Sequence, residues 1–156
     1  MDSFIAARVI HVLSIIFWIG GVAMVTTVLL PAVRQFKSKE EQVEFFEQVE
    51  SRFAWQSRFT TLFAGLSGFY LVHVLNAWSR FGSAEYWWMT MMVVVWIIFT
   101  LMLFIMEPLF LHKLLVKKAK AQPEKVFSMI QRMHWFLLLI SVITAGGAIA
   151  GSHGWL

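Results

Sequence analysis

Four apolar stretches, each about 20 residues long or longer, constrain the fold of this chain more than any other feature. They cover 4–30, 53–79, 86–111 and 127–151. A helix of that length spans the hydrocarbon core of a bilayer. The chain is 59% hydrophobic and only 14% charged, whereas soluble domains are about 45–50% apolar and about 25% charged. We therefore predict an all-α integral membrane protein with four transmembrane helices.

The connections between these stretches are short, which favours an antiparallel, up-down-up-down four-helix bundle. The length of 156 residues is enough for one domain, so we expect a single membrane domain over 1–156. The first stretch is not a convincing signal peptide, because it is too long, follows Asp2 and lacks a cleavage site. We predict that it is the first helix of the mature protein and ends near Pro31. The absence of cysteine excludes disulfides, thiolate metal sites and cysteine-based catalysis.

A charged segment, 38–52, precedes the second apolar stretch. Ser38 followed by Glu41 is typical of a capping box at a helix start. Four apolar residues then recur at helical spacing: Val43, Phe46, Val49 and Phe53. The pattern predicts an amphipathic cytoplasmic helix that either lies at the membrane interface or extends the second membrane helix. A solvated charged extension also fits these residues.

The distribution of positive charge predicts the orientation in the membrane. Of the 13 Lys and Arg residues, only Arg8 and Arg80 fall on the side of the two chain ends and the second loop. The other eleven fall on the side of the first and third loops. Cytoplasmic loops are enriched in Lys and Arg, so both termini should be periplasmic in a bacterial inner membrane. This distribution explains the net charge of +4 without a nucleic-acid partner.

Two histidines fall at matching depths in neighbouring helices. From the rise of about 1.5 Å per residue, His11 lies about 9 Å and His73 about 10 Å outside the middle of its helix. Two imidazoles at one level could be the axial ligands of a haem b. Trp18 lies on the face of His11, and Arg8, one turn earlier, could meet a haem propionate. Each histidine could instead hydrogen-bond a neighbouring helix.

A second set of ionisable residues lies in the cytoplasmic half. Arg58 and Glu107 could form an ion pair, serve a proton or quinone route, or, through Arg58, contact a propionate. His134 could ligate a second haem or bond Glu107. His112 and His153 are typical of interfacial residues, although His153 could be an extra ligand at the outer site.

Methionine is frequent, with nine residues in the chain. Met129 and Met133 are one turn apart, and His134 follows directly. Thioethers bind Cu(I), so a copper site is an alternative, and ordinary apolar packing of the methionines is another.

These residues resemble motifs of the copper-resistance D (CopD-like) membrane family along the whole chain. The matching pieces are His11-x6-Trp18-x-Gly20-Gly21, Glu50-Ser51-Arg52-Phe53 with Arg58 and 65–70, Arg132-x-His134, and 151–154. The pattern of the first helix also resembles the haem-containing protoporphyrinogen IX oxidases (HemJ-like). That resemblance implies a haem b bound through His11. The last helix lacks the Asn-Glu-x-Pro segment of that group, so we carry over the haem-binding bundle and not the substrate.

The leading hypothesis is a haem b membrane protein with His11 and His73 as axial ligands. Such a protein would pass electrons between a membrane donor, such as a quinol, and a redox partner outside, and as an enzyme it would be a haem oxidoreductase. A copper protein using His11, His73, His153 and methionines is the first alternative. A cofactor-free membrane scaffold is the second. The sequence leaves the oligomeric state open.

Overall fold

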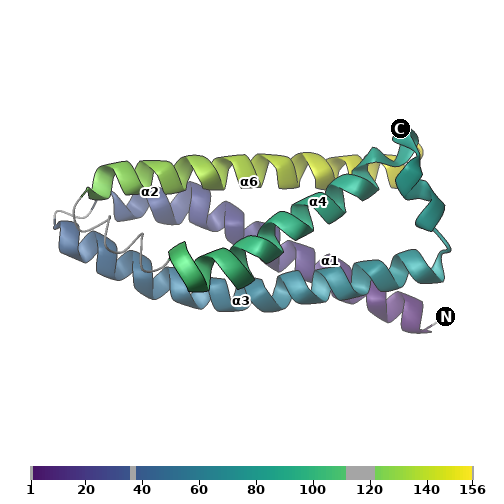
Figure 1. Ribbon diagram of the computed structural model, residues 1–156, viewed down its shortest axis with the longest axis horizontal. Helices are drawn as coiled ribbons and strands as arrows, with labels where there is room; N and C mark the ends of the chain where they lie inside the picture. The colour runs from purple at the N-terminus through teal and green to yellow at the C-terminus, as the bar shows by residue number, and fades with distance from the viewer. Residues whose placement is uncertain (1, 36–37, 112–121, 156) are drawn as a thin grey trace.

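The computed structural model describes residues 2–35, 38–111 and 122–155. The described residues are almost all helical and include no strand. The described helices form four long rods. Figure 1 shows the rods lying side by side, with both chain ends at the same end. We call this end the terminal end. We call the opposite end the basic end. The helix that ends at Val33 and those that begin at Lys39 and Pro123 meet there, and most Lys and Arg residues of the sequence fall near these positions.

The first rod consists of three consecutive elements: α1 (Asp2–Met24), η1 (Val25–Leu29) and α2 (Leu30–Val33). It is a few residues longer than the predicted 4–30 and continues past Pro31. The element η1 is a π-helix, in which the amide of residue i+5 donates to the carbonyl of residue i. The residue five positions after Thr26 is Pro31, which has no amide hydrogen. The side chain of Gln131 donates to the Thr26 carbonyl instead, at 2.6 Å.

The second rod is the continuous helix α3 (Lys39–Val74). The Ser38 hydroxyl accepts a hydrogen bond from the Glu41 amide at 3.3 Å, which confirms the predicted cap. The amphipathic segment therefore extends the second helix. Its Val43 and Phe46 are buried at the basic end, in a cluster with residues of the first and last rods: Val25, Leu29, Leu30, Val33, Val126, Phe127 and Ile130.

The prediction that the second helix runs to Ser79 is wrong. The helix ends at Val74, and Asn76 has a positive φ of 50°. Asparagine tolerates this left-handed conformation better than most residues. The Ala77 amide then donates back to the Val72 carbonyl at 2.9 Å, which closes the helix end. Two short 3-10 turns, η2 (Trp78–Gly82) and η3 (Ala84–Tyr86), lead to the third rod.

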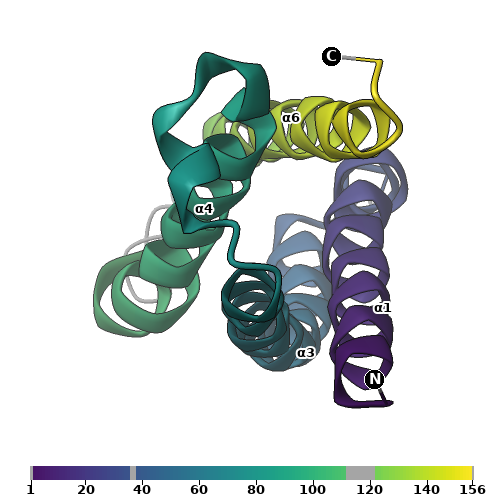
Figure 2. The ribbon, with the colours of Figure 1, turned by 90° about the vertical axis from the view of Figure 1, so that its right-hand side faces the viewer.

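The third rod, α4 (Trp87–Leu101) with η4 (Met102–Leu111), crosses the molecule obliquely. At the terminal end it lies beside α6 (Pro123–Ser152), and at the basic end it lies beside α3 (Figures 1 and 2). Glycines permit these crossings. A Cβ at Gly147 would lie 2.7 Å from the Trp87 ring, and Gly65 faces Trp96 closely. The rods therefore approach each other closely at Gly147 and Gly65, whereas nothing lies within 4 Å of a Cβ at Gly20 or Gly146.

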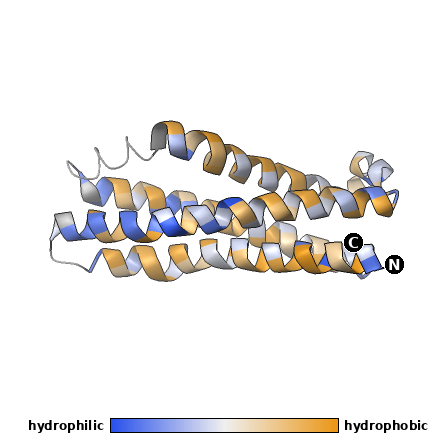
Figure 3. Cartoon of the chain, turned by 90° about the horizontal axis from the view of Figure 1, so that it is seen from below, coloured by the Kyte–Doolittle hydropathy of each residue, from blue (hydrophilic) through white to orange (hydrophobic). Residues whose placement is uncertain are grey.

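Within the described part of the chain, three stretches are long and apolar enough to cross a membrane: Asp2–Val33, Ala84–Leu109 and Glu124–Ser152. The helix α3 is not among them. Figure 3 shows why, because hydrophilic residues gather on α3 toward the basic end while the other rods are largely hydrophobic. These findings support a membrane protein.

The bond between Gln131 and Thr26 gives a first test. We expect Gln131→Leu to lower the free energy of unfolding by about 1–3 kcal/mol, because it leaves a buried carbonyl without a donor. In a Pro31→Ala background the amide of residue 31 is restored and can donate to the Thr26 carbonyl. Gln131→Leu should therefore lower the free energy of unfolding clearly less in that background. Denaturation in detergent measures the free energy of unfolding of the wild type, of each single variant and of the double variant. Equal costs in the two backgrounds would contradict this account of the proline.

Candidate functional site

The half-buried His11 points from α1 toward α3. Its Nδ1 lies 2.9 Å from the Ala64 carbonyl oxygen and 3.3 Å from the Ser67 hydroxyl. A carbonyl can only accept, so Nδ1 carries the proton and donates to Ala64. The other ring nitrogen, Nε2, keeps its lone pair. A Cβ at Gly68 would lie 2.9 Å from Cε1 of this ring, so α3 makes room for the imidazole by having no side chain there.

The structure does not bring His73 to His11. His73 is exposed and lies five residues after Gly68 on α3, which places it about 140° around the helix from the side that contacts His11. Because His11 contacts α3 at residues 64–68, His73 also lies about 7.5 Å beyond Gly68 along the helix. The equal depth predicted from the sequence is therefore wrong. Within one chain, these two histidines do not form an opposed pair.

Trp18 and Arg8, the other two residues expected near His11, differ in exposure. Trp18 is buried, with 5% of its surface exposed, and packs edge-on against Phe99 with ring centroids 4.8 Å apart. The buried Nε1 of Trp18 has no hydrogen-bond partner among the described residues. Arg8 is exposed, one turn before His11.

In the basic half, Arg58 binds two groups on the third rod. It forms an ion pair with Glu107, which confirms the pairing suggested by the sequence, and its Nε donates to the Leu103 carbonyl at 3.1 Å. Leu103 lies in the π-helical element η4, where the expected donor to its carbonyl is residue 108. That residue is Pro108, which has no amide hydrogen. Arg58 replaces the missing donor and is thereby held away from other ligands.

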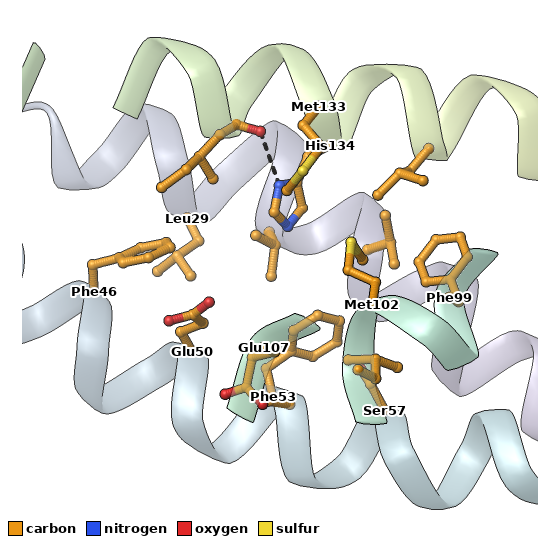
Figure 4. A pocket seen from close by; sticks show the side chains of 16 residues that line it. Leu29, Phe46, Glu50, Phe53, Ser57, Phe99, Met102, Glu107, Met133 and His134 are labelled. Atoms are coloured by element: carbon orange, nitrogen blue, oxygen red, sulfur yellow. Dashed lines mark hydrogen bonds between the residues drawn. The ribbon is translucent and has the colours of Figure 1, made fainter. Parts of the chain in front are cut away.

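A cavity of about 70 Å³ lies in the same half of the bundle, between all four rods. Apolar residues form most of its wall, and Figure 4 shows polar side chains reaching it from α3, η4 and α6. His134 donates from Nδ1 to the Ile130 carbonyl at 2.9 Å, and its other nitrogen points into the cavity. The remaining polar and sulfur-bearing residues of the wall are Glu50, Ser57, Met102, Glu107 and Met133.

Three of these wall residues, Glu50, Ser57 and Met102, were not predicted. Glu50, Phe53 and Ser57 recur at intervals of three and four residues on α3, which is the spacing of one helix face. That spacing could have indicated Glu50 and Ser57, but their distance from His134 depends on the packing of two separate helices.

The remaining candidate ligands do not gather around a metal. His153 is exposed at the terminal end and its Nδ1 donates to the Ile149 carbonyl at 2.8 Å. Met129 is 52% exposed, whereas Met133 lines the cavity. His112 lies outside the described residues. The described ranges contain no group of three or more His, Cys, Asp or Glu that could hold a metal ion.

Comparisons with protein-family models, with curated proteins and with solved structures find no match to this chain. The resemblance to CopD-like and HemJ-like proteins therefore depends on the motifs quoted above.

The two bonds of Arg58 give a second test. We expect Arg58→Lys to lower the free energy of unfolding by about 1–3 kcal/mol, because an ammonium cannot reproduce the rigid fork that serves the Leu103 carbonyl and Glu107 together. Arg52→Lys, at an exposed position on the same helix, is the control and should stay within about 0.5 kcal/mol. Denaturation in detergent measures both. A cost at Arg58 no larger than at Arg52 would contradict the role given to this side chain.

Proposed function

We propose that the four rods form an antiparallel transmembrane bundle in a bacterial inner membrane, with both termini on the periplasmic side. Three of the rods are apolar enough to cross on their own. The less apolar α3 bonds to two of them, through His11 of α1 and Trp96 of α4, so part of its polar surface is turned toward neighbouring rods. The excess of Lys and Arg in the first and third loops supports the orientation.

Within this bundle we propose a haem b bound through Nε2 of His11. The hydrogen bond from Nδ1 to the Ala64 carbonyl carries the proposal. Histidines that ligate a metal almost always donate their other ring nitrogen to a carbonyl, carboxylate or water, which fixes the tautomer and the ring orientation. His11 has this arrangement.

The residues fit one axial position of a haem and not both. His11 fits, whereas His73 of the same chain lies on another face of α3. The proposal therefore names His11 as the only axial ligand within one chain and assigns no role to His73. Arg8, on the terminal side of His11, would meet a propionate, and Trp18 would form the apolar wall. A bound haem would supply one-electron chemistry with a membrane donor such as a quinol.

A cofactor-free scaffold is the second candidate. One observation favours it: the His11 bond to Ala64 already joins α1 to α3 and gives this histidine a structural role. Both candidates need the same bond, and they differ in whether Nε2 binds anything.

A third test separates the two candidates and examines His73. We expect the detergent-purified protein to show a Soret band and visible absorption bands that shift on reduction by dithionite, because His11 would ligate the haem iron. His11→Ala should lose these bands, and His73→Ala should keep them. Circular dichroism shows whether each variant is folded.

A colourless, folded wild-type protein from haem-replete cells would overturn the haem proposal and favour the scaffold. Loss of the bands in both folded variants would restore His73 as a ligand.

Gly68 gives a fourth test, with a matched control. A methyl group at Gly68 would lie 2.9 Å from the His11 ring, whereas nothing lies within 4 Å of a Cβ at Gly146. We expect Gly68→Ala to displace the imidazole and lower the haem-to-protein ratio, by about tenfold if the displacement weakens binding by about 1.4 kcal/mol. Gly146→Ala should leave the ratio unchanged. The ratio follows from the Soret absorbance and the protein concentration, and an unchanged ratio in Gly68→Ala would contradict this role of the glycine.

A further inference from the structure

The sequence Arg-x-x-Trp occurs twice in this chain, once in α3 and once in α6. Its residues are Arg52 and Trp55 in α3, and Arg132 and Trp135 in α6. Residues three positions apart are neighbours on the surface of a helix. All four side chains are exposed, Trp55 by 62% and Trp135 by 51%. Each Arg-Trp pair therefore presents a guanidinium and an indole side by side on the outside of the bundle.

The two Arg-Trp pairs lie at the same level along the bundle. The rings of Phe46 in α3 and Phe127 in α6 pack edge to face, with centroids 5.4 Å apart, and both helices run from the basic end to the terminal end. From this contact, Trp55 lies nine residues along α3 and Trp135 eight residues along α6. These separations correspond to about 13.5 Å and about 12 Å. The two indoles therefore differ in level by only about one residue.

The outer surface of both helices changes character at this level. On the terminal side, the exposed residues from Phe59 to Leu66 on α3 are apolar, and those from Phe136 to Ile149 on α6 are apolar or glycine. On the basic side, most of the described exposed residues are polar (Figure 3). The polar ones include Glu41, Glu44, Gln48 and Ser51 of α3, and Glu124 and Lys125 of α6.

The apolar surface on the terminal side has the length of a hydrocarbon core. Helix α3 continues for 19 residues from Trp55 to Val74, and α6 for 17 residues from Trp135 to Ser152. These lengths correspond to about 29 Å and about 26 Å, and the hydrocarbon core of a bilayer is about 30 Å thick. An exposed tryptophan follows each helix end, Trp78 and Trp155. Tryptophan is enriched at both membrane interfaces, so these aromatic levels fit the two edges of one bilayer.

We propose that each Arg-Trp pair binds the phosphate of a phospholipid headgroup in the leaflet at the basic end, and that the hydrocarbon core ends at this level. The proposal rests on the proposed transmembrane bundle. A guanidinium pairs with phosphate through two parallel hydrogen bonds, and an indole lies at the headgroup level. In both pairs the arginine is on the basic side of the tryptophan, so the charge faces the headgroups. Arg132 uses its Nε to bond the Ser128 carbonyl at 3.4 Å, and its terminal nitrogens would meet the phosphate.

The part of the bundle beyond this level then forms a cap in water. From Lys39 to Arg52, α3 covers 13 residues, or about 20 Å. Its inner face packs against the first and last rods around Phe46 and Phe127, whereas its outer face is mostly polar. An apolar inner face with a polar outer face is the pattern of a helix at the surface of a soluble domain. The first rod has no Asp, Glu, Lys or Arg between Arg8 and Arg34, so it supplies no marker of its own.

Because the chain contains no cysteine, spin labels on single introduced cysteines can locate the boundary. The exposed residues Gln48 and Met129 precede the two Arg-Trp pairs, and the exposed residues Phe59 and Leu139 follow them. In vesicles of phosphatidylcholine and phosphatidylglycerol, oxygen relaxes labels inside the hydrocarbon, and a water-soluble nickel complex relaxes labels outside it. We expect Phe59→Cys and Leu139→Cys to respond mainly to oxygen, and Gln48→Cys and Met129→Cys mainly to nickel.

The other outcomes separate this proposal from the bundle on which it rests. A response to oxygen at all four positions would overturn the boundary and retain the transmembrane bundle. A response to nickel at all four would overturn the bundle and the boundary together. A change from nickel to oxygen on only one of the two helices would overturn the shared level.

Binding of phosphatidylglycerol to the detergent-purified protein tests the headgroup contacts directly. Native mass spectrometry during a lipid titration counts the bound molecules. We expect Arg52→Gln and Arg132→Gln each to weaken the binding of one lipid by about fivefold, because each removes a cation from the headgroup level. Arg34→Gln removes the same charge from an exposed position at the basic end and should leave binding unchanged. Wild-type affinity in both Arg-Trp variants, or an equal loss in Arg34→Gln, would overturn the headgroup sites.

Discussion

The structure depends on hydrogen-bond donors that pair with backbone carbonyls inside an apolar bundle. A carbonyl without a donor is costly where neither water nor a polar side chain can reach it. Proline removes the donors expected for the carbonyls of Thr26 and Leu103, and side chains from neighbouring rods, Gln131 and Arg58, donate in their place. Each of these bonds crosses between two rods. A local defect in one helix thus becomes a contact that sets the register of another.

The helix α3 is the centre of this network, and its composition follows from that position. Trp96 of α4 donates to its Thr61 carbonyl at 2.9 Å, and His11 of α1 donates to its Ala64 carbonyl. Glycines opposite these rings provide the space they need. The same small and polar residues lower the hydropathy of α3, so it is not among the helices apolar enough to cross a membrane alone. The proposed site uses some of the groups that make α3 different from the other rods.

The predictions about where the second helix begins succeeded because they depended on residues close in sequence. Ser38 caps α3 because the Glu41 amide is three residues away. The 38–52 segment extends the helix because its apolar residues recur at helical spacing and meet the basic-end cluster. The pair of Arg58 and Glu107 was suggested because two opposite charges in apolar helices have few other partners. The end of α3 was missed, since Asn76 rather than the apolar pattern decides where the helix closes.

The sequence by itself determined that this chain is helical and apolar, because its apolar stretches are long enough to form helices that span a bilayer. Only the tertiary structure decided which polar residues meet. Depth does not determine the rotation of a helix about its axis, and that rotation is set by glycine contacts and carbonyl donors on other rods. His11 contacts α3 between Ala64 and Gly68, and His73 lies beyond that level and on another face of the helix. Ser57 and His134, far apart in the sequence, line one cavity.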